Sequence, residues 1–470
     1  MTDVTNLTIS SIIDGYKTKQ FSVTEIVKAY LERIQKFDKE INSFITLDDK
    51  NALEKAKKLD NSEATSPLHG VPYGIKDMFL TKGIRTTAAS RLLENYIPSY
   101  SSTATDRLDH EGAISLGKLN HDAWAHGSSG ENSDFGNTKN PWNKDYVPGG
   151  SSSGSAAAIA SSFATFATGT DTGGSIRLPA SFTNTVGLKP TYGLVPRYGV
   201  ISMASSLDSI GHFTKTVEDS ARILEITQGA DGYDATIRQS PDEKTLYLPS
   251  IKKGIKGLRV GIPKEFTVSG LSPNVKKIFD ESLKTLEELG AIFEEVSLPH
   301  TEYGIATYYI IQPSEVSSNL ARYDGVRFGH DRSYFGKEAK RRIMLGTYTL
   351  SSGYYDAYYK KAMQVRTLVK KDFDDAFGKV DVLMSPVSPT PPWKFGEKAN
   401  NPLEMYLSDA LTVTINLAGV PGLSVPAGFT QDLLPVGIQF IGPHFSENML
   451  FQTGYAFEQE TRFFEHNPTL

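Results

Sequence analysis

The chain has 470 residues, of which 39% are hydrophobic and 22% are charged, with a net charge of −5 and a pI of about 6.0. This composition is typical of a globular protein with a large core, and its acidic balance argues against a phosphate-binding surface over the whole molecule. The sequence has no cysteine, which excludes a thiol nucleophile, a disulfide and cysteine-ligated zinc. No apolar run approaches ~20 residues and the N-terminus lacks the pattern of a signal peptide, so we expect a cytoplasmic protein.

The N-terminal segment, about residues 1–65, is predicted to be mainly helical and to pack on the rest of the chain. The tetrapeptide Ser22–Glu25 has the pattern of a capping box, which begins an amphipathic helix over residues 23–39. Alternating apolar residues in 41–46 predict a strand, and the pattern of 51–60 predicts a second helix.

From about residue 70 onward, short apolar strands alternate with glycine-rich turns and later with helices. A β-α-β crossover is predicted in 257–299, because a helix that begins at Pro273 and ends before Gly290 lies between two apolar strands. This alternation predicts an α/β fold, with a single large domain over residues 1–470 and a mixed central β-sheet that helices cover on both faces. The other predicted elements are strands at 70–79, 113–120, 380–386, 422–427 and 435–442, and helices at about 303–322, 336–349, 356–377 and from 447.

The segment from Val147 to Ser181 is rich in glycine and serine and allows several interpretations. A flexible linker would be polar throughout, but the residues after Ser155 are mostly alanine and other small or apolar types, which favours a packed segment. Residues 149–154 have the spacing of a phosphate-binding loop without its lysine. Residues 150–154 fit the G-x-S-x-G nucleophile elbow, but no hydrophobic strand precedes them.

A lysine and a second glycine turn suggest a different chemistry. Lys76 lies among apolar and small residues, and a lysine held neutral by burial can be the base for a serine nucleophile. A lysine at a strand end that extends to water is the alternative. The turn at 171–177 has two adjacent glycines, so its backbone N–H groups can hold an oxyanion. An ordinary tight turn fits the same residues.

Taken together, these segments resemble the amidase signature family. The resemblance covers a core over about residues 70–227, in which the motifs follow the family's order. It continues in segments such as "SEVSSNLARYDGVRFG", which is similar to one branch of the family, the A subunits of the tRNA-dependent amidotransferases. The core motifs are "HGVPYGIKDMF", "GKLNHDAWAHGSSGENSDFGNTKNPWN", "PGGSSSGSAAAIA", "GTDTGGSIRLPA", "GLKPTYGLVPRYG" and "SSLDSIGHFTKTVEDSA".

The resemblance implies a set of catalytic residues. Ser175 would be the nucleophile, and Ser151, which follows a cis peptide bond in the family, would relay its proton to Lys76. The relay needs a neutral lysine, which burial favours. The N–H groups of the turn around Ser175 would stabilise the oxyanion. The residues implied for this oxyanion hole are Thr172, Gly173 and Gly174.

The resemblance also implies substrate-binding residues for glutamine. Arg342 would bind its α-carboxylate and Asp409 its α-amino group, because these side chains have the complementary charge and geometry. Tyr308 would contact the same ligand. Taken without their motifs, Arg342 and Asp409 predict surface ion pairs instead. We expect no metal in this site.

For the activity, the resemblance implies a glutaminase that forms an acyl-enzyme and supplies ammonia to a partner B subunit. That partner would bind misacylated tRNA and use ATP and Mg to convert Glu-tRNA(Gln) or Asp-tRNA(Asn). A small C subunit would complete a heterotrimer, and this chain itself would need no cofactor. The alternatives are a stand-alone amidase acting on another small amide and a binding protein with an inactive site.

The chain departs from the family pattern at several positions. Methionines are usual where it has His121 and His126, a pair that could suggest a metal site, although a polar lining of the glutamine entrance is the preferred explanation. Ser153 replaces a glycine, so its turn must accommodate a side chain. After residue 329 the chain is shorter than many relatives, which affects the rim of the pocket.

Overall fold

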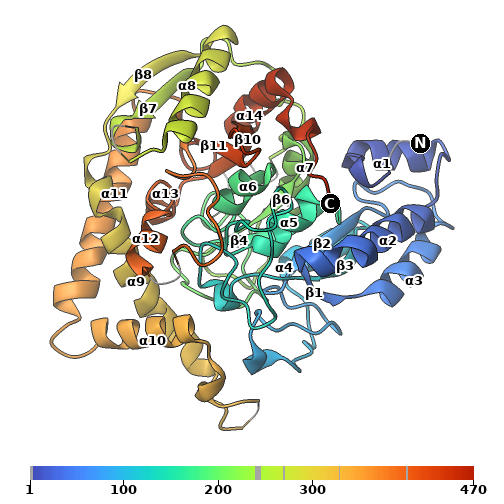
Figure 1. The fold of residues 1–470 in the computed structure, drawn as a ribbon, viewed down its shortest axis with the longest axis horizontal. Helices are drawn as coiled ribbons and strands as arrows, with labels where there is room; N and C mark the ends of the chain where they lie inside the picture. The colour runs from blue at the N-terminus through green and yellow to red at the C-terminus, as the bar shows by residue number, and fades with distance from the viewer. Residues whose placement is uncertain (1–3, 239–244, 268–269, 328, 399–400) are drawn as a thin grey trace.

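A mixed β-sheet runs through the middle of the molecule (Figure 1). The computed structural model describes residues 4–238, 245–267, 270–327, 329–398 and 401–470. Within these ranges the sheet has 11 strands in the order β1-β3-β2-β4-β6-β5-β10-β11-β9-β7-β8. Strand β2 pairs in parallel with β3 and β4, and β7 with β8 and β9, while the other neighbouring strands are antiparallel. The strands are β1 Phe44–Leu47, β2 Pro72–Lys76, β3 Ile114–Leu119, β4 Phe166–Asp171, β5 Val186–Lys189, β6 Ser209–Thr214, β7 Arg259–Pro263, β8 Ile292–Val296, β9 Val382–Pro386, β10 Gly422–Phe429 and β11 Pro435–Ile441.

Helices flank both ends of this sheet. The helices α1, α2 and α3 lie at the end that contains β1, and α8 and α11 lie at the opposite end with β7 and β8 (Figure 1). The predicted fold class, α/β with a mixed central sheet and helices on both faces, is therefore confirmed. The helices are α1 Ile9–Lys17, α2 Val23–Ile41, α3 Asp49–Leu59, α4 Thr103–His110, α5 Ser153–Ala160, α6 Arg177–Thr183, α7 Val217–Thr227, α8 Pro273–Glu288, α9 Gly304–Asn319, α10 Lys337–Thr349, α11 Lys361–Phe377, α12 Pro402–Leu407, α13 Val413–Ala418 and α14 Glu447–Thr461.

The N-terminal capping box forms as predicted. The Ser22 N–H donates to Glu25 Oε2 at 2.7 Å, and the Glu25 N–H donates to Ser22 Oγ at 3.2 Å. Two of the N–H groups that a helix start leaves without a backbone partner are thereby satisfied. The helix runs two residues further than predicted, to Ile41, and ends at Asn42 in the left-handed conformation, as is common at a helix C-terminus.

The predicted β-α-β crossover is β7–α8–β8, with its two strands parallel. Helices α10 and α14 begin within one residue of their predicted starts, whereas two other C-terminal helices differ from the prediction in detail. The stretch predicted as one helix over 356–377 begins with a π-helical turn, η8 (Asp356–Lys360), before α11. Likewise, the predicted helix 303–322 consists of α9 between short 3₁₀ turns. Helix α9 packs against both α10 and α11, and local periodicity does not encode such contacts between helices.

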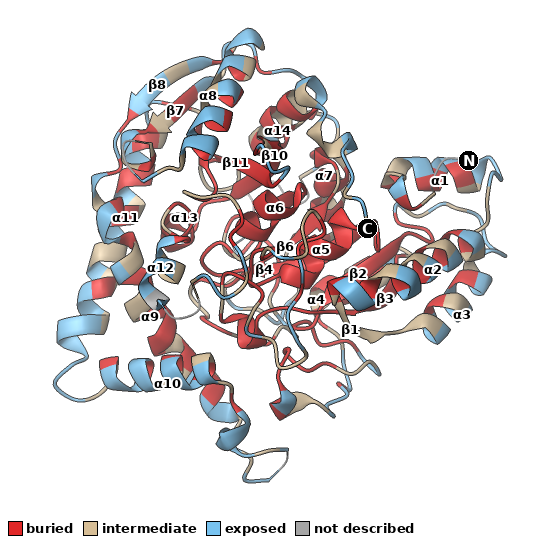
Figure 2. Cartoon of the chain, viewed as in Figure 1, coloured by how far each residue is buried: buried red, intermediate tan, exposed pale blue. Residues whose placement is uncertain are grey.

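The helices α5 and α6 are buried along their whole length in the centre of the molecule (Figure 2). Helix α5 can pack this deeply because its residues are small. At Gly154, for example, a Cβ would lie 2.5 Å from the carbonyl oxygen of Asn120, which is too close. The alanine-rich segment after Ser155 is therefore packed, as its composition predicts. These two helices begin directly after the two glycine turns, so their burial fixes where the turns lie.

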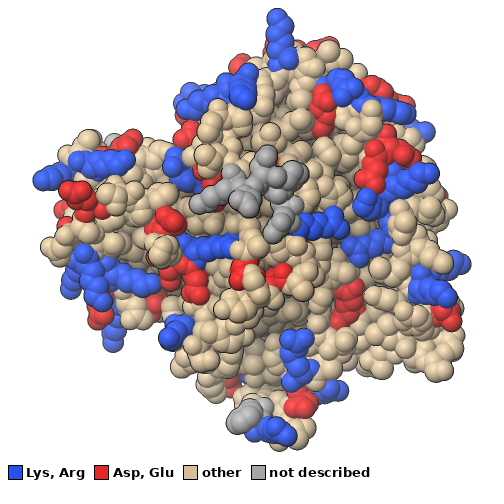
Figure 3. Space-filling view, turned by 180° about the vertical axis from the view of Figure 1, so that it is seen from behind, with Lys and Arg blue, Asp and Glu red and all other residues tan. Residues whose placement is uncertain are grey.

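Basic and acidic side chains are interspersed on the face of the molecule seen in Figure 3. This distribution agrees with the small net charge and offers no broad surface of one sign on that face. Across the described ranges, none of the helices has the length and apolarity that crossing a membrane requires.

Candidate active site

Lys76 is the last residue of β2, and its side chain is fully buried. Its Nζ donates to Ser151 Oγ at 2.9 Å, to Ser152 Oγ at 2.8 Å and to Thr170 Oγ1 at 2.7 Å. Burial lowers the pKa of Lys76 to about 7, because a low-dielectric environment disfavours the ammonium form. A large fraction of this amine is therefore neutral near pH 7 and can accept a proton.

The turn that presents Ser151 is held by backbone hydrogen bonds. The peptide bond between Gly150 and Ser151 is cis, as the resemblance implies. The Ser151 carbonyl oxygen accepts from the N–H of Asp122 at 3.1 Å and of Ser153 at 2.9 Å. A Cβ at Gly150 would lie 2.1 Å from the Asp122 carboxylate, so a side chain there would displace it.

Ser153 is accommodated without disturbing this turn. It is the first residue of α5 and is fully buried, and its Oγ lies 3.3 Å from Thr138 Oγ1. Its Cβ occupies the space beside Gly130, where an added Cβ would come within 2.7 Å of it. The missing side chain at Gly130 thus leaves room for the serine that replaces a glycine of the family pattern.

Hydrogen bonds to the Asp171 side chain hold the turn that carries Ser175. The Asp171 carboxylate accepts from the N–H of Gly174 at 2.8 Å and from Arg177 Nε and Nη2, both at 3.0 Å. Burial raises the pKa of Asp171, but the Arg177 guanidinium outweighs it and holds that pKa at about 2. The carboxylate is therefore ionised at any physiological pH and keeps the turn in place.

The hydrogen bond to Asp171 changes the expected set of oxyanion donors. The Gly174 N–H is occupied by Asp171, whereas the sequence pattern suggests it as a free donor. Among the described residues, the N–H groups of Thr172, Gly173 and Ser175 donate to no acceptor. These three groups are the ones available to an oxyanion.

The nucleophile candidate itself is half-buried at this turn. The Ser152 N–H donates to the Ser175 carbonyl oxygen at 3.2 Å, which joins the two glycine turns. In the described part of the chain, the Ser175 hydroxyl has no hydrogen-bond partner. It is thus free to approach a substrate. Tyr308 lies beside it, because a Cβ at Gly173 would be 2.7 Å from Tyr308 Cζ.

Arg342 and Asp409 lie on either side of Tyr309, which the sequence did not single out. The Tyr309 hydroxyl donates to Asp409 Oδ2 at 3.0 Å, and the Arg342 guanidinium lies 5.4 Å from the centre of the Tyr309 ring. Ser128 Oγ also donates to Asp409 Oδ2, at 2.9 Å. Burial raises the pKa of Asp409 to about 6, so it is ionised above that pH. Both charged groups are buried, 5% and 6% exposed, which contradicts the alternative that they are surface ion-pair partners.

Several contacts of the site escaped sequence reasoning. The sequence gives a weak indication of Thr170, because alternation along β4 places it on the same face as Thr168. In the structure the Thr168 hydroxyl accepts from the Lys76 N–H at 2.9 Å. Ser152 lies next to Ser151, and no sequence pattern distinguishes it as a contact of Lys76. Tyr309 is adjacent to the predicted Tyr308, and both rings are packed edge to face at 5.0 Å.

His121 and His126 lie in the loop between β3 and the Ser151 turn. The His121 Nδ1 is 2.7 Å from the Asp122 carbonyl oxygen, and both rings are buried. No cluster of three or more His, Asp or Glu side chains that could hold a metal occurs among the described residues. Burial lowers the pKa of both imidazoles well below the usual range, so both are neutral at pH 7.

A hollow beside Thr170 and Thr172 adjoins a wider cleft. Tyr323, Arg327 and His330, which lie on either side of residue 329, line the cleft. The residues that line both spaces are Arg197, Val200, Ile201 and Ser202.

The site combines a buried lysine, hydrogen-bonded to the Ser151 hydroxyl, with a second serine on a glycine turn of an α/β fold. These are groups that could hydrolyse an amide without a histidine base. The family model described as Amidase matches residues 25–451. The chain therefore belongs to the amidase family.

Individual relatives cover the chain almost completely. The A subunit of the glutamyl-tRNA(Gln) amidotransferase of Alkaliphilus metalliredigens is 51% identical, over 99% of this chain and 98% of that protein. The crystal structure of the corresponding A subunit from Thermotoga maritima has a TM-score of 0.84 and 40% identity, over 98% of this chain and 96% of that one. Peptide amidase from Stenotrophomonas maltophilia also has a TM-score of 0.84, at 28% identity and 98% coverage of both chains.

Proposed function

We propose that this chain is the glutaminase component of a tRNA-dependent amidotransferase. The observation that carries the proposal is the arrangement of one site: a buried lysine hydrogen-bonded to Ser151, a free serine hydroxyl at Ser175, and a buried cation and anion at Arg342 and Asp409. A free amino acid with a side-chain amide carries the charges that match this pair. The relatives that are A subunits of glutamyl-tRNA(Gln) amidotransferases, which cover nearly the full chain, support the same assignment.

In the first half of the reaction, Ser175 Oγ attacks the carboxamide carbon of glutamine. Its proton passes to Ser151 Oγ while the proton of Ser151 passes to Lys76 Nζ, so the base becomes an ammonium. The free N–H groups of Thr172, Gly173 and Ser175 would stabilise the oxyanion, an effect worth about 3–4 kcal/mol per donor in other acyl-transfer enzymes.

In the second half, the tetrahedral intermediate collapses and the C–N bond breaks. The leaving nitrogen receives the proton from Lys76 by way of Ser151 and departs as ammonia, which leaves a glutamyl ester on Ser175. Water then attacks this ester with the same relay acting as base, and glutamate leaves. A lysine whose pKa lies near 7 suits both directions of proton transfer, because the ideal catalytic pKa lies near the working pH.

The substrate ends would be held by opposite charges. Arg342 would bind the α-carboxylate and Asp409 the α-ammonium, with Tyr308 against the Ser175 turn. Because Asp409 is ionised above a pH of about 6, its attraction for an ammonium group is present at neutral pH.

We further assign the acceptor chemistry to partner chains. A B subunit would bind the misacylated tRNA and use ATP and Mg to activate it for attack by ammonia, and a C subunit would complete the heterotrimer. No cofactor is assigned to this chain. The net charge of −5 agrees with a partner as the main tRNA-binding chain, and the one face seen in Figure 3 has basic and acidic side chains interspersed.

Glutamate release by the purified chain, alone and with candidate B and C subunits, tRNA and ATP, tests the proposal. We expect glutamine to be hydrolysed and the partners to raise the rate and couple it to amidated tRNA. Rapid turnover of simple aliphatic amides, with no response to the partners, would identify a stand-alone amidase instead.

A further inference from the structure

Buried polar groups without partners occur at Gln312, which contacts Arg342, and at His126, on which the charge of Arg342 acts. In the described part of the chain, both ring nitrogens of His126 and the Nε2 of Gln312 are buried and make no hydrogen bond. Buried polar groups are nearly always paired, because leaving them unpaired is costly. A ligand that satisfies them explains why they stay in the interior.

Gln312 is orientated by the arginine itself. Its side chain is fully buried on α9, and its Oε1 accepts from Arg342 Nη1 at 2.8 Å. This contact fixes the amide, because only the oxygen can accept from a guanidinium. The NH₂ group therefore faces away from Nη1 as a free donor. Arg342 Nε is also occupied, by Glu338 Oε1 at 2.8 Å, whereas Nη2 has no acceptor among the described residues.

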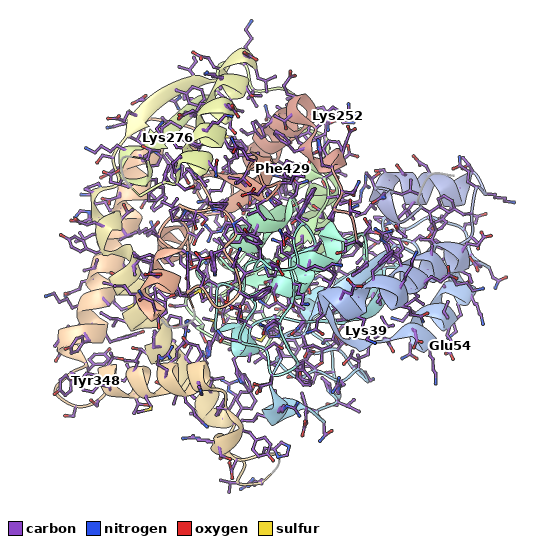
Figure 4. The ribbon with its side chains drawn as sticks, viewed as in Figure 1. Lys39, Glu54, Lys252, Lys276, Tyr348 and Phe429 are labelled. Atoms are coloured by element: carbon purple, nitrogen blue, oxygen red, sulfur yellow. The ribbon has the colours of Figure 1, made fainter. Side chains whose placement is uncertain are left out.

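Close packing of two helices holds this pair in place. Gly346 lies one turn after Arg342 on α10, and a Cβ there would be 1.8 Å from the Pro313 carbonyl oxygen on α9. The backbones of α9 and α10 therefore touch directly beside Gln312. The opposite side of α10 faces solvent, where Tyr348 lies at the periphery of the molecule (Figure 4).

His126 belongs to another part of the chain, and the charge of Arg342 acts on its imidazole. It follows the short turn η3 (Ala123–Ala125) and is 1% exposed, and Asn132 Nδ2 donates to its carbonyl oxygen at 3.0 Å. Two residues further on, Ser128 bonds Asp409. Burial, and next the positive charge of Arg342, lower the pKa of His126. A neutral imidazole has one N–H to donate.

We propose that His126 and Gln312 bind the α-carboxylate of the amide substrate together with Arg342. The carboxylate would accept from Arg342 Nη2, from the Gln312 amide and from one ring N–H of His126. The inference rests on the proposed function and deepens it, because it names what selects the substrate class: an amino acid with both a free α-carboxylate and a side-chain amide. A site whose buried donors await a carboxylate discriminates strongly against an analogue that lacks one.

Binding to a Ser175→Ala background tests this without turnover. The two probes are L-glutamine and 4-aminobutanamide, which is glutamine without its α-carboxylate, and affinities are measured by calorimetry. We expect His126→Ala to weaken glutamine binding by about tenfold, as loss of a hydrogen bond to a charged group does, and to leave 4-aminobutanamide unaffected. His126→Asn, which keeps a neutral donor, is expected to restore part of the loss.

Gln312→Glu is the sharper variant. A carboxylate at this position would occupy Arg342 and repel the substrate carboxylate, so we expect glutamine binding to fall by about 100-fold or more. Its effect on 4-aminobutanamide should be far smaller. His212→Asn is the matched control, because His212 is also buried but bonds Ser220 Oγ at 2.7 Å, away from Arg342.

Four outcomes separate the possibilities. Unchanged glutamine affinity in His126→Ala and Gln312→Glu overturns this inference, and so does an equal loss for both probes, which indicates a structural role. If the Ser175→Ala parent does not bind glutamine at all, the proposed function fails instead. Loss for glutamine alone, with folding and His212→Asn binding unchanged, supports the inference.

Discussion

The two ends of the proposed site are built in different ways. At the catalytic end, strands β2 and β4 and the two glycine turns hold Lys76 and Asp171 through hydrogen bonds within the protein. At the substrate end, helices α9 and α10 and one loop leave buried donors without partners. On the proposed function, the chemical groups are preorganised, whereas the selective groups would be completed by the ligand.

Among the variants that test this difference between the two ends, loss of the nucleophile is expected to have the largest effect on activity. We expect Ser175→Ala to lower kcat for glutamine by about 10⁴-fold or more, with glutamine affinity retained, since the substrate end does not depend on this hydroxyl. Glutamate release and calorimetry measure the two parts. Full activity in the variant would remove Ser175 from the catalytic role.

Loss of the base is expected to be the next largest effect. We predict that Lys76→Ala lowers kcat by about 10³-fold, as removal of a general base does, without changing KM for glutamine more than a few-fold. Lys189→Met is the control: this lysine is also fully buried, its pKa is also lowered to about 7 by burial, and its Nζ donates to the Pro190 carbonyl oxygen. A folded Lys76→Ala enzyme with normal kcat would refute the relay.

At the substrate end, Arg342→Lys is expected to raise KM for glutamine by about 30- to 100-fold, because a lysine cannot replace the planar fork of a guanidinium. Its neighbour provides a matched control. Arg341 is half exposed and pairs with Glu338, so Arg341→Lys should leave KM unchanged. The opposite result would move the carboxylate site by one residue.

The pH dependence of kcat/KM depends on one ionisable group at each end of the site. Lys76 must be neutral and has a pKa of about 7, and Asp409 must be ionised and has a pKa of about 6. Both requirements are met at higher pH, so we expect kcat/KM for glutamine to rise about tenfold from pH 6 to pH 7 and to level off above pH 8. A profile that falls over this range would contradict the neutral lysine.

The smallest effect concerns Ser153. Because its Oγ makes one long contact to Thr138, Ser153→Gly should lower the free energy of unfolding by about 1 kcal/mol, mainly through backbone entropy. Thermal or denaturant unfolding measures this change. We expect kcat to stay within about twofold, since the backbone N–H that bonds Ser151 remains. A large loss of kcat would show that the catalytic end is less rigid than its hydrogen bonds indicate.

The sequence predicts the catalytic end better than the substrate end for a physical reason. The capping box of α2, the packed alanine-rich α5 and the two glycine turns depend on residues close in the sequence, so local patterns reveal them. The use of the Gly174 N–H by Asp171 is also local, but it depends on a side-chain direction that composition does not give. Family motifs supplied the roles that spacing alone left open.

Tyr309 and Gln312 could not be predicted in the same way. Whether Tyr308 or Tyr309 meets Asp409 depends on how α9 is rotated about its axis, and that rotation is set by contact with α10. The role proposed for Gln312 depends on its hydrogen bond to Arg342, which lies on another helix. Such pairings join residues distant in the sequence, and periodicity within one element carries no information about them.

The contact between Gly346 and Pro313 has a consequence for how such an enzyme can diversify. Because the backbones of α9 and α10 touch at this crossing, outside the central sheet, mutations on their inner faces could change which amide is recognised while the sheet and its reaction are inherited intact. Related enzymes could therefore acquire a new substrate while keeping the same catalytic residues, provided that a glycine remains at position 346, where α10 crosses α9.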